Sequence, residues 1–225
     1  MPLKPNLIPA RVRGIAMALD TNYGHRPDTM MRWFISAVME LWGFKPWDRI
    51  PDDARAKITT AIGEYDAALQ RYPWADLLGD VYQALASQGA RQSLGQFFTP
   101  DHVCRLISQM NYKTIPANRK ELFRVSDPAC GGGAMLLAFC NEVLERQGPE
   151  ALQGVGVYAC DLDAYCARMC AVQLLANCFS QQVELGEIVV LRGNSLSDER
   201  KEVIVHATSP TREPRQEPRY LELAA

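Results

Sequence analysis

Apolar side chains recur at helical spacing through the first part of the chain and as short continuous runs through the rest. Between residues 27 and 42 they fall three and four positions apart, which predicts an amphipathic helix. The same spacing predicts further helices over residues 51–72, with an interruption near Gly63, and over residues 74–87. Residues 1–20 mix Pro, Lys and Arg, and we expect them to form an extended arm.

From residue 92 the pattern changes to short apolar runs that alternate with helical stretches. Strands are predicted over residues 123–127, 154–160, 188–192 and 202–206, and helices over residues 102–110, 134–147 and 164–177. Such alternation implies a parallel sheet with right-handed crossovers. We therefore predict an α/β domain at 92–206, an all-helical region at 1–91 and a Pro-, Arg- and Glu-rich tail at 207–225.

The composition is that of a globular protein, with 48% hydrophobic and 22% charged residues. No apolar run is long enough to span a membrane and the N-terminus lacks a signal-peptide pattern, so a cytoplasmic location is expected. Seven scattered cysteines suggest reduced thiols, and histidines far from one another and from any cysteine pair argue against a zinc site. The net charge of −2 gives no overall signature of nucleic-acid binding, so a DNA-handling role would need a local basic face or a partner.

A glycine-rich turn separates the first predicted strand of the α/β domain from the next helix: Asp127, Pro128, Ala129, Cys130, Gly131, Gly132 and Gly133. Glycine lets the backbone approach a ligand and the helix N-terminus supplies free N–H groups, as in a nucleotide-binding corner. The turn begins with an acid and contains no Lys-Ser or Lys-Thr, which argues against the dinucleotide fingerprint and the phosphate-binding loop. An acidic turn suits a cationic ligand with an α-amino group, such as S-adenosylmethionine (AdoMet).

A second segment, GQFFTP at residues 95–100, precedes the turn. Together the two segments resemble the N6-adenine DNA methyltransferases, particularly the modification subunit of type I restriction systems. In that family GQFFTP comes first and DPACGSG second, so only Gly132 departs from the pattern. The resemblance runs from about Asp76 to about Asn194, and residues 76–82 resemble the family segment before Phe-Thr-Pro. It implies an AdoMet-dependent methyltransferase domain with a Rossmann-like sheet.

The resemblance also implies a set of cofactor contacts. Phe98 and Thr99, with Gln96 as a weaker candidate, would fold over the methionine end of AdoMet, although Thr99 could instead cap the following helix. Asp161, after the second strand, would accept hydrogen bonds from the ribose hydroxyls, whereas Asp163 is expected to cap a helix.

The turn after the third strand contains Asn194, in a match to the family's Gly-Asn-x-Leu. Its side chain would bond the exocyclic amine of the AdoMet adenine, although Gly-Asn-Ser is also an ordinary turn sequence. The expected AdoMet contacts are therefore Phe98, Thr99, Asp127, Pro128, Ala129, Gly131, Gly133, Asp161 and Asn194.

The motif that holds the target base is degenerate. Methylation of adenine N6 requires the base to leave the stack and enter a pocket, where the family grips it with Asn-Pro-Pro-Tyr or Asn-Pro-Pro-Phe. After the fourth strand this chain offers only Ser209 and Pro210 in register, without the second proline or the aromatic ring. The missing ring removes base stacking worth about 1–3 kcal/mol.

Three functions remain open at this point. The chain could be an N6-adenine DNA methyltransferase completed by self-association, a specificity subunit or a second methyltransferase subunit, joined through the edge of the fourth strand. It could be a non-catalytic relative that keeps the AdoMet pocket, or a remnant of it, and acts as a binding or regulatory protein, for example by interfering with a restriction–modification complex. Methylation of a protein glutamine, which relies on the same missing motif, is the weakest alternative.

Overall fold

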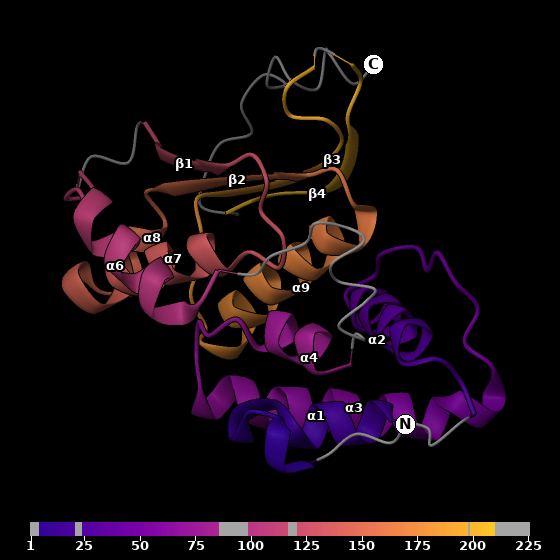
Figure 1. Ribbon diagram of the computed structural model, residues 1–225. Helices are drawn as coiled ribbons and strands as arrows, with labels where there is room; N and C mark the ends of the chain where they lie inside the picture. Colours follow the sequence, from indigo (N-terminus) through magenta and orange to yellow (C-terminus); the bar gives the residue numbers. More distant parts are fainter. Residues whose placement is uncertain (1–4, 21–23, 86–98, 117–120, 198, 210–225) are drawn as a thin grey trace. The chain divides into compact units, whose positions relative to one another are not determined.

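A computed structural model describes residues 5–20, 24–85, 99–116, 121–197 and 199–209 (Figure 1). Contacts divide the chain into two compact units. The helical unit comprises Met1–Pro73 and Leu77–Phe97, and the sheet unit comprises Trp74–Asp76 and Phe98–Ala225. The short segment Trp74–Asp76 therefore packs with the sheet unit, although helical residues flank it in the sequence.

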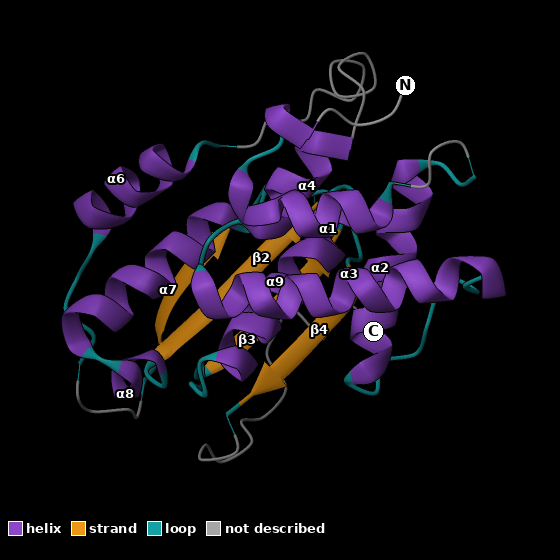
Figure 2. Cartoon of the chain, turned by 90° about the horizontal axis from the view of Figure 1, so that it is seen from below, coloured by secondary structure: helices purple, strands orange, loops and turns teal. Residues whose placement is uncertain are grey.

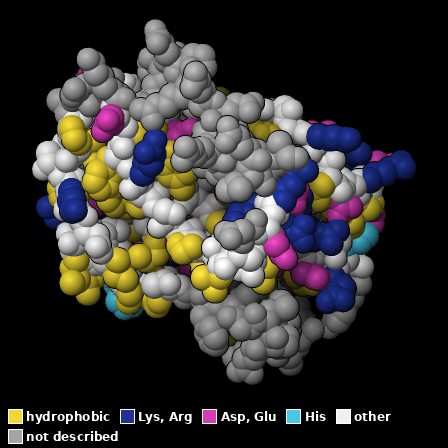
Figure 3. All heavy atoms as spheres, turned by 90° about the horizontal axis from the view of Figure 1, so that it is seen from above, with side chains coloured by type: hydrophobic (Ala, Val, Ile, Leu, Met, Phe, Trp, Pro, Cys, Tyr) yellow, Lys and Arg dark blue, Asp and Glu magenta, His cyan; other side chains and the backbone are white. Residues whose placement is uncertain are grey.

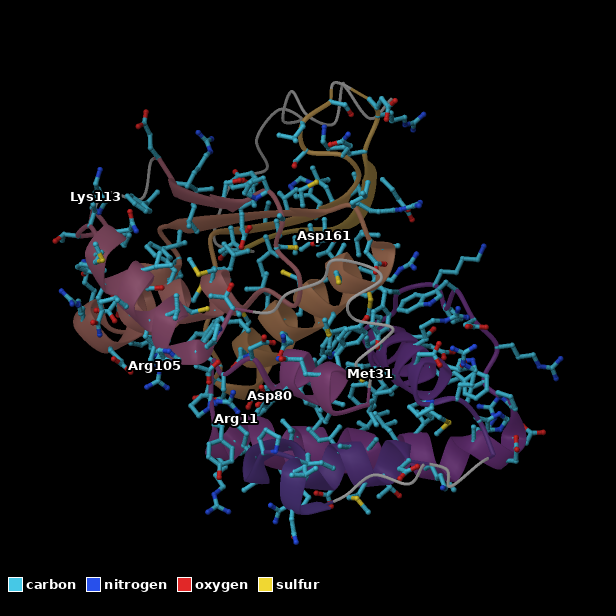
Figure 4. All side chains as sticks on the ribbon, viewed as in Figure 1. Arg11, Met31, Asp80, Arg105, Lys113 and Asp161 are labelled. Carbon is cyan, nitrogen blue, oxygen red and sulfur yellow. The ribbon has the colours of Figure 1, made fainter. Side chains whose placement is uncertain are left out.

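The described helices of the first unit are η1 (Pro5–Leu7), η2 (Ala10–Val12), α1 (Arg13–Leu19), α2 (Pro27–Leu41), α3 (Asp52–Arg71) and α4 (Leu77–Leu85). The expected extended arm at residues 1–20 is wrong where it is described, because Ile15 and Leu19 of α1 are buried in the helical core. An ion pair of 2.6 Å between Arg11 Nε and Asp80 Oδ2 ties η2 to α4 (Figure 4).

Two further predictions in this unit have different outcomes. Helix α2 forms as predicted, with Pro27 in its first turn and Gly43, at φ +82°, just after its end. The interruption expected near Gly63 is absent, since α3 continues from Asp52 to Arg71. Glycine costs a helix about 1 kcal/mol relative to alanine, and the buried side chains on either side of Gly63 offset this cost.

The sheet unit alternates strands with helices, as the apolar pattern predicts. Its described elements are α6 (Asp101–Asn111), β1 (Phe123–Asp127), α7 (Ala134–Gln147), α8 (Pro149–Leu152), β2 (Val155–Asp161), α9 (Ala164–Ser180), β3 (Glu187–Arg192) and β4 (Glu202–Thr208). The strand order is β1-β2-β3-β4, and the first three strands are parallel. Figures 1 and 2 show α7 and α9 on one side of this sheet.

The direction of the fourth strand differs from the prediction. We expected a wholly parallel sheet, but β4 pairs antiparallel with β3, with Val190 opposite Val205. The connection, residues 193–201, is shorter than the dozen or more residues that a parallel crossover needs. The chain therefore folds back beside β3 as a hairpin, and the α/β fold class is retained.

The core of the sheet unit lies between the strands and the helices on one side. The side chains of Val157, Ala159 and Val190 are buried there, and the rings of Phe123 and Phe139 stack with centroids 5.8 Å apart. This packing fixes the carboxyl ends of β1, β2 and β3 along one edge of the sheet, where a doubly wound fold binds its ligand.

Candidate functional site

The glycine-rich turn between β1 and α7 is held by backbone hydrogen bonds. The N–H of Cys130 donates to the carbonyl of Cys160 at 2.9 Å, which ties the turn to the end of β2. Gly131 and Gly133 have φ values of +51° and +94°, in the left-handed region that favours glycine. A Cβ at Gly133 would lie 2.8 Å from Cys170 Sγ, so α9 packs directly on the turn.

Asp161 joins the turn to the loop that follows β2. Its Oδ2 accepts the Gly131 N–H at 2.8 Å and its Oδ1 accepts the Asp163 N–H at 2.9 Å. Asp161 therefore stands beside the turn, at the end of β2 (Figure 4). A carboxylate has about four acceptor positions, so capacity remains for the ribose hydroxyls of a nucleoside.

Asp127 and Asp161 bring two negative charges to the same edge of the sheet. Burial raises the pKa of the Asp127 carboxyl, a hydrogen bond from the Ala129 N–H lowers it, and the charge of Asp161 raises it further. Two carboxylates that repel each other form an environment that favours a bound cation.

The carboxyl end of β3 lies beside that of β2. The N–H of Gly193 donates to the carbonyl of Asp161 at 2.9 Å, so Asn194 follows directly beside the end of β2. The Oδ1 of Asn194 accepts the Leu196 N–H at 3.0 Å, which forms the turn that the sequence left open as an alternative. Asp163 caps α9 as predicted, accepting the Tyr165 N–H at 2.8 Å.

The structure describes only part of the Phe-Thr-Pro segment. Gln96 and Phe98 lie outside the described residues. Thr99 is exposed, and its carbonyl accepts the thiol of Cys104 at 3.6 Å. It does not cap the following helix, because α6 begins at Asp101 and Pro100 occupies the N-cap position.

The glycine-rich turn and Asp161 lie within the region that matches a known family. The model of the N-6 DNA Methylase family matches residues 74–211, which is more than half of the chain. The chain belongs to the N-6 DNA methylase family. The resemblance drawn from GQFFTP and DPACGGG is therefore confirmed, and methyltransferases of this family and fold are generally AdoMet-dependent.

Two solved structures are similar to this N-6 DNA methylase family member. One is from Listeria monocytogenes and is assigned to the class I S-adenosylmethionine-dependent methyltransferases, with 13% identity, a TM-score of 0.41 and coverage of 83% of this chain. The other is the type I restriction-modification system methyltransferase subunit from Streptococcus thermophilus, with 16% identity, a TM-score of 0.33 and coverage of 73%. This chain spans 54% of the first protein and 40% of the second.

Ser209, the first of the two candidate base-binding residues, does not lie at the acidic ends of β1 and β2. Because β4 runs antiparallel, Ser209 lies at the amino end of β3, where its N–H donates to the Gly186 carbonyl at 3.2 Å. Its hydroxyl donates to Glu184 Oε2 at 2.5 Å, and the residue is buried. Pro210 lies outside the described residues. Asp127 and Asp161 therefore lie at the carboxyl ends of their strands, and Ser209 lies at the opposite end of the sheet, beside the amino end of β3.

A cleft of about 500 Å³ lies beside β1. Residues of α6, all five residues of β1 and the apolar side chains Met135, Leu136 and Phe139 of α7 line it. Within the described residues β1 has a strand neighbour on one side only, so its other edge faces this cleft. In the doubly wound strand order 3-2-1-4, the fourth strand lies beside the first strand, on the side away from the second.

Sequence reasoning missed two polar residues that touch the turn. Asp76 is buried and its Oδ1 accepts the Gln173 Nε2–H at 2.7 Å. The same nitrogen donates to the carbonyl of Gly132 at 2.7 Å. A signal was present in the sequence, because Gln173 is a polar residue inside an otherwise apolar helical run.

The cysteines are free thiols, and all except Cys178 are buried. Burial raises the pKa of Cys104 to about 11 and that of Cys178 to about 12, so both thiols stay protonated at neutral pH. This agrees with the expected reduced, core-filling role. Among the residues that the structure describes, no cluster of three His, Cys, Asp or Glu could hold a metal, and no helix is long and apolar enough to cross a membrane.

Proposed function

We propose that this chain binds AdoMet at the carboxyl ends of β1, β2 and β3 and is the cofactor-binding part of an N6-adenine DNA methyltransferase. The observation that carries the proposal is the pair of acids, Asp127 and Asp161, joined through the glycine-rich turn by the Gly131 N–H bond of 2.8 Å. The acids suit a cation with ribose hydroxyls, and the glycines allow the close backbone approach that such a ligand needs.

Each residue has a distinct role in the proposed site. Asp127 would accept hydrogen bonds from the α-amino group, Asp161 from the ribose hydroxyls, and Asn194 from the adenine amine. Phe98 and Thr99 would cover the methionine end, and the backbone of Pro128, Ala129, Gly131 and Gly133 would line the pocket. AdoMet supplies a methyl group on a positively charged sulfur, which is activated for transfer to a nucleophilic amine.

We propose that a partner supplies the base-binding part. Ser209 is buried against Glu184 at the amino end of β3, so it has no access to a methyl group held at the carboxyl edge. We infer that a partner carrying an Asn-Pro-Pro-aromatic motif places it beside β1, where the strand has an open edge. From the sequence we expected the partner to join at the edge of the fourth strand. We now propose the open edge of β1 instead.

DNA affinity would also depend on a partner. The net charge of the chain is −2, and Figure 3 shows Lys and Arg side chains lying among Asp and Glu over the coloured part of one face. In the sheet unit, Arg168 and Arg192 both pair with Glu202. Since phosphate contacts supply most of the affinity for DNA, a specificity subunit or a second methyltransferase subunit would provide the basic surface.

The transfer of labelled methyl groups to unmethylated DNA tests this division of roles. The purified chain should transfer none, and addition of a methyltransferase subunit with an intact Asn-Pro-Pro-aromatic motif should produce methyladenine. The partner subunit with its motif Asn changed to Ala is the control. Transfer by the purified chain alone would contradict the proposal, and so would continued inactivity in the mixture.

The position of Ser209 also favours a second candidate, a non-catalytic AdoMet-binding relative that regulates a restriction–modification complex. The same assay separates the two. A regulator would bind AdoMet and lower the methyl transfer of an intact restriction–modification complex, whereas a cofactor-binding subunit would support transfer by an incomplete one.

A further inference from the structure

The glycine-rich turn is held from the side of α9 by one buried carboxamide. Gln173 is 0% exposed, and its Nε2 donates one hydrogen to the Gly132 carbonyl and one to Asp76 Oδ1, both at 2.7 Å. Both partners are acceptors, so only the nitrogen of the carboxamide can face them. The orientation of Gln173 is therefore fixed by its two contacts.

Asp76 approaches the turn from a segment distant in sequence. A Cβ at Gly132 would lie 3.0 Å from Asp76 Oδ1 and 3.4 Å from Gln173 Nε2, so both side chains pack against the turn. The N–H of Trp74 donates to Asn177 Oδ1 at 2.5 Å, which anchors this segment to α9 one helical turn after Gln173. The segment and the turn are thus both attached to the same helix.

The opposite side of the turn is held by Asp161, whose carboxylate accepts the Gly131 N–H. Gly131, Gly132 and Gly133 have greater backbone freedom than other residues, and fixing that freedom costs conformational entropy. The bond to Gln173 keeps the Gly132 carbonyl directed at α9. Without this bond the peptide after Gly132 is free to rotate, and fewer molecules would hold the turn ready for a ligand.

We propose that Gln173 and Asp76 are positioning residues that hold the glycine-rich turn in its ligand-binding conformation before AdoMet binds. The inference rests on the proposed function, since it assigns a role toward the same cofactor site. It assigns no contact between either residue and AdoMet. The mechanism is preorganisation, in which affinity falls by the fraction of molecules that lose the competent conformation.

Amide hydrogen exchange of residues 127–137, measured without ligand, tests the positioning role directly. Gln173→Met keeps the side-chain length but removes both donors. If one molecule in ten then keeps the turn, amide exchange in this segment should approach the rate of unprotected amides. Gln181→Met is the matched control, since it makes the same substitution just after α9, where the carboxamide donates to Ser180 Oγ at 3.4 Å rather than to the turn. Its exchange in this segment should match that of the wild type.

AdoMet calorimetry supplies the second readout. Gln173→Met should bind about tenfold more weakly than the wild type if one molecule in ten keeps the turn, because the apparent affinity is reduced to that fraction. Asp76→Leu should weaken binding as well, and Asp76→Asn should restore it because an amide oxygen still accepts the Gln173 N–H. Rescue by Asn and failure of Leu would distinguish an acceptor role from simple packing.

The outcomes separate the two claims. Wild-type exchange and affinity in Gln173→Met would overturn the positioning role while leaving the proposed function intact. Absence of AdoMet binding in the wild type would overturn the proposed function. Faster exchange in the variant would then show only that Gln173 stabilises the turn, and the role toward AdoMet would be overturned as well. If Gln173→Met does not fold, as judged by circular dichroism, the comparison of Asp76→Leu with Asp76→Asn decides between the outcomes.

Discussion

Asp127 carries a partly buried charge beside that of Asp161. Because its pKa in the folded chain is raised, the folded state binds more protons than the unfolded state over the window above the ordinary value of 3.8. The free energy of unfolding contributed by this group is therefore greatest at low pH and falls as pH rises through that window. Asp127→Asn should raise the free energy of unfolding at neutral pH and flatten this dependence, as measured by urea denaturation at several pH values.

The same substitution should weaken the binding of AdoMet. A hydrogen bond to a charged group is worth about 1.5–3 kcal/mol, which corresponds to a loss of roughly ten- to hundredfold in affinity. Glu121→Gln, which changes an exposed acid just before β1, controls for the change in net charge. A variant that is more stable yet binds AdoMet as tightly as the wild type would remove Asp127 from the site.

The individual residues of the site were predictable to different degrees. Asp163 was predicted as a helix cap because an acid directly before an apolar helical run is a strong local signal. Asp161 was predicted to follow a strand, and the structure adds that it binds the backbone of the turn. Gln173 and Asp76 meet only through tertiary packing between positions far apart in sequence, so no local pattern could pair them.

At the scale of elements, the turn between β1 and α7 depends on the absence of side chains. Gly133→Ala would place a Cβ 2.8 Å from Cys170 Sγ at a φ of +94°. Gly43→Ala is the control, since φ is +82° there but nothing lies within 4 Å of the Cβ. The control should lose about 1–2 kcal/mol of unfolding free energy from backbone strain alone, and Gly133→Ala should lose more. Equal losses in urea denaturation would contradict close packing of α9 on the turn.

Most elements were predictable because their apolar periods are strong. The bounds of β1 and α7 agree with the prediction, whereas β4 was predicted in the right place with the wrong direction. The short connection at 193–201 contained the information needed to predict the hairpin. Helix α1 was missed because its apolar stripe of Ile15 and Leu19 is short and lies in a segment with scattered proline and arginine.

At the scale of the whole molecule, the position of Ser209 separates it from the proposed chemistry. Ser209→Ala should leave AdoMet affinity unchanged, and it should leave unchanged the methyl transfer of any complex that the chain completes. It should lower the free energy of unfolding by about 1 kcal/mol, since Glu184 loses one hydrogen-bond donor. Calorimetry and thermal unfolding check the two expectations, and loss of transfer without loss of stability would return Ser209 to the catalytic site.

The central claim is that an AdoMet site lies at the carboxyl ends of β1, β2 and β3, apart from Ser209. Titration calorimetry of AdoMet into the wild type, Asp127→Asn and Ser209→Ala tests it most directly. The account predicts saturable binding at one site per chain, weaker binding by Asp127→Asn and unchanged binding by Ser209→Ala. No heat of binding at millimolar AdoMet, or a loss of affinity in Ser209→Ala with none in Asp127→Asn, would contradict it.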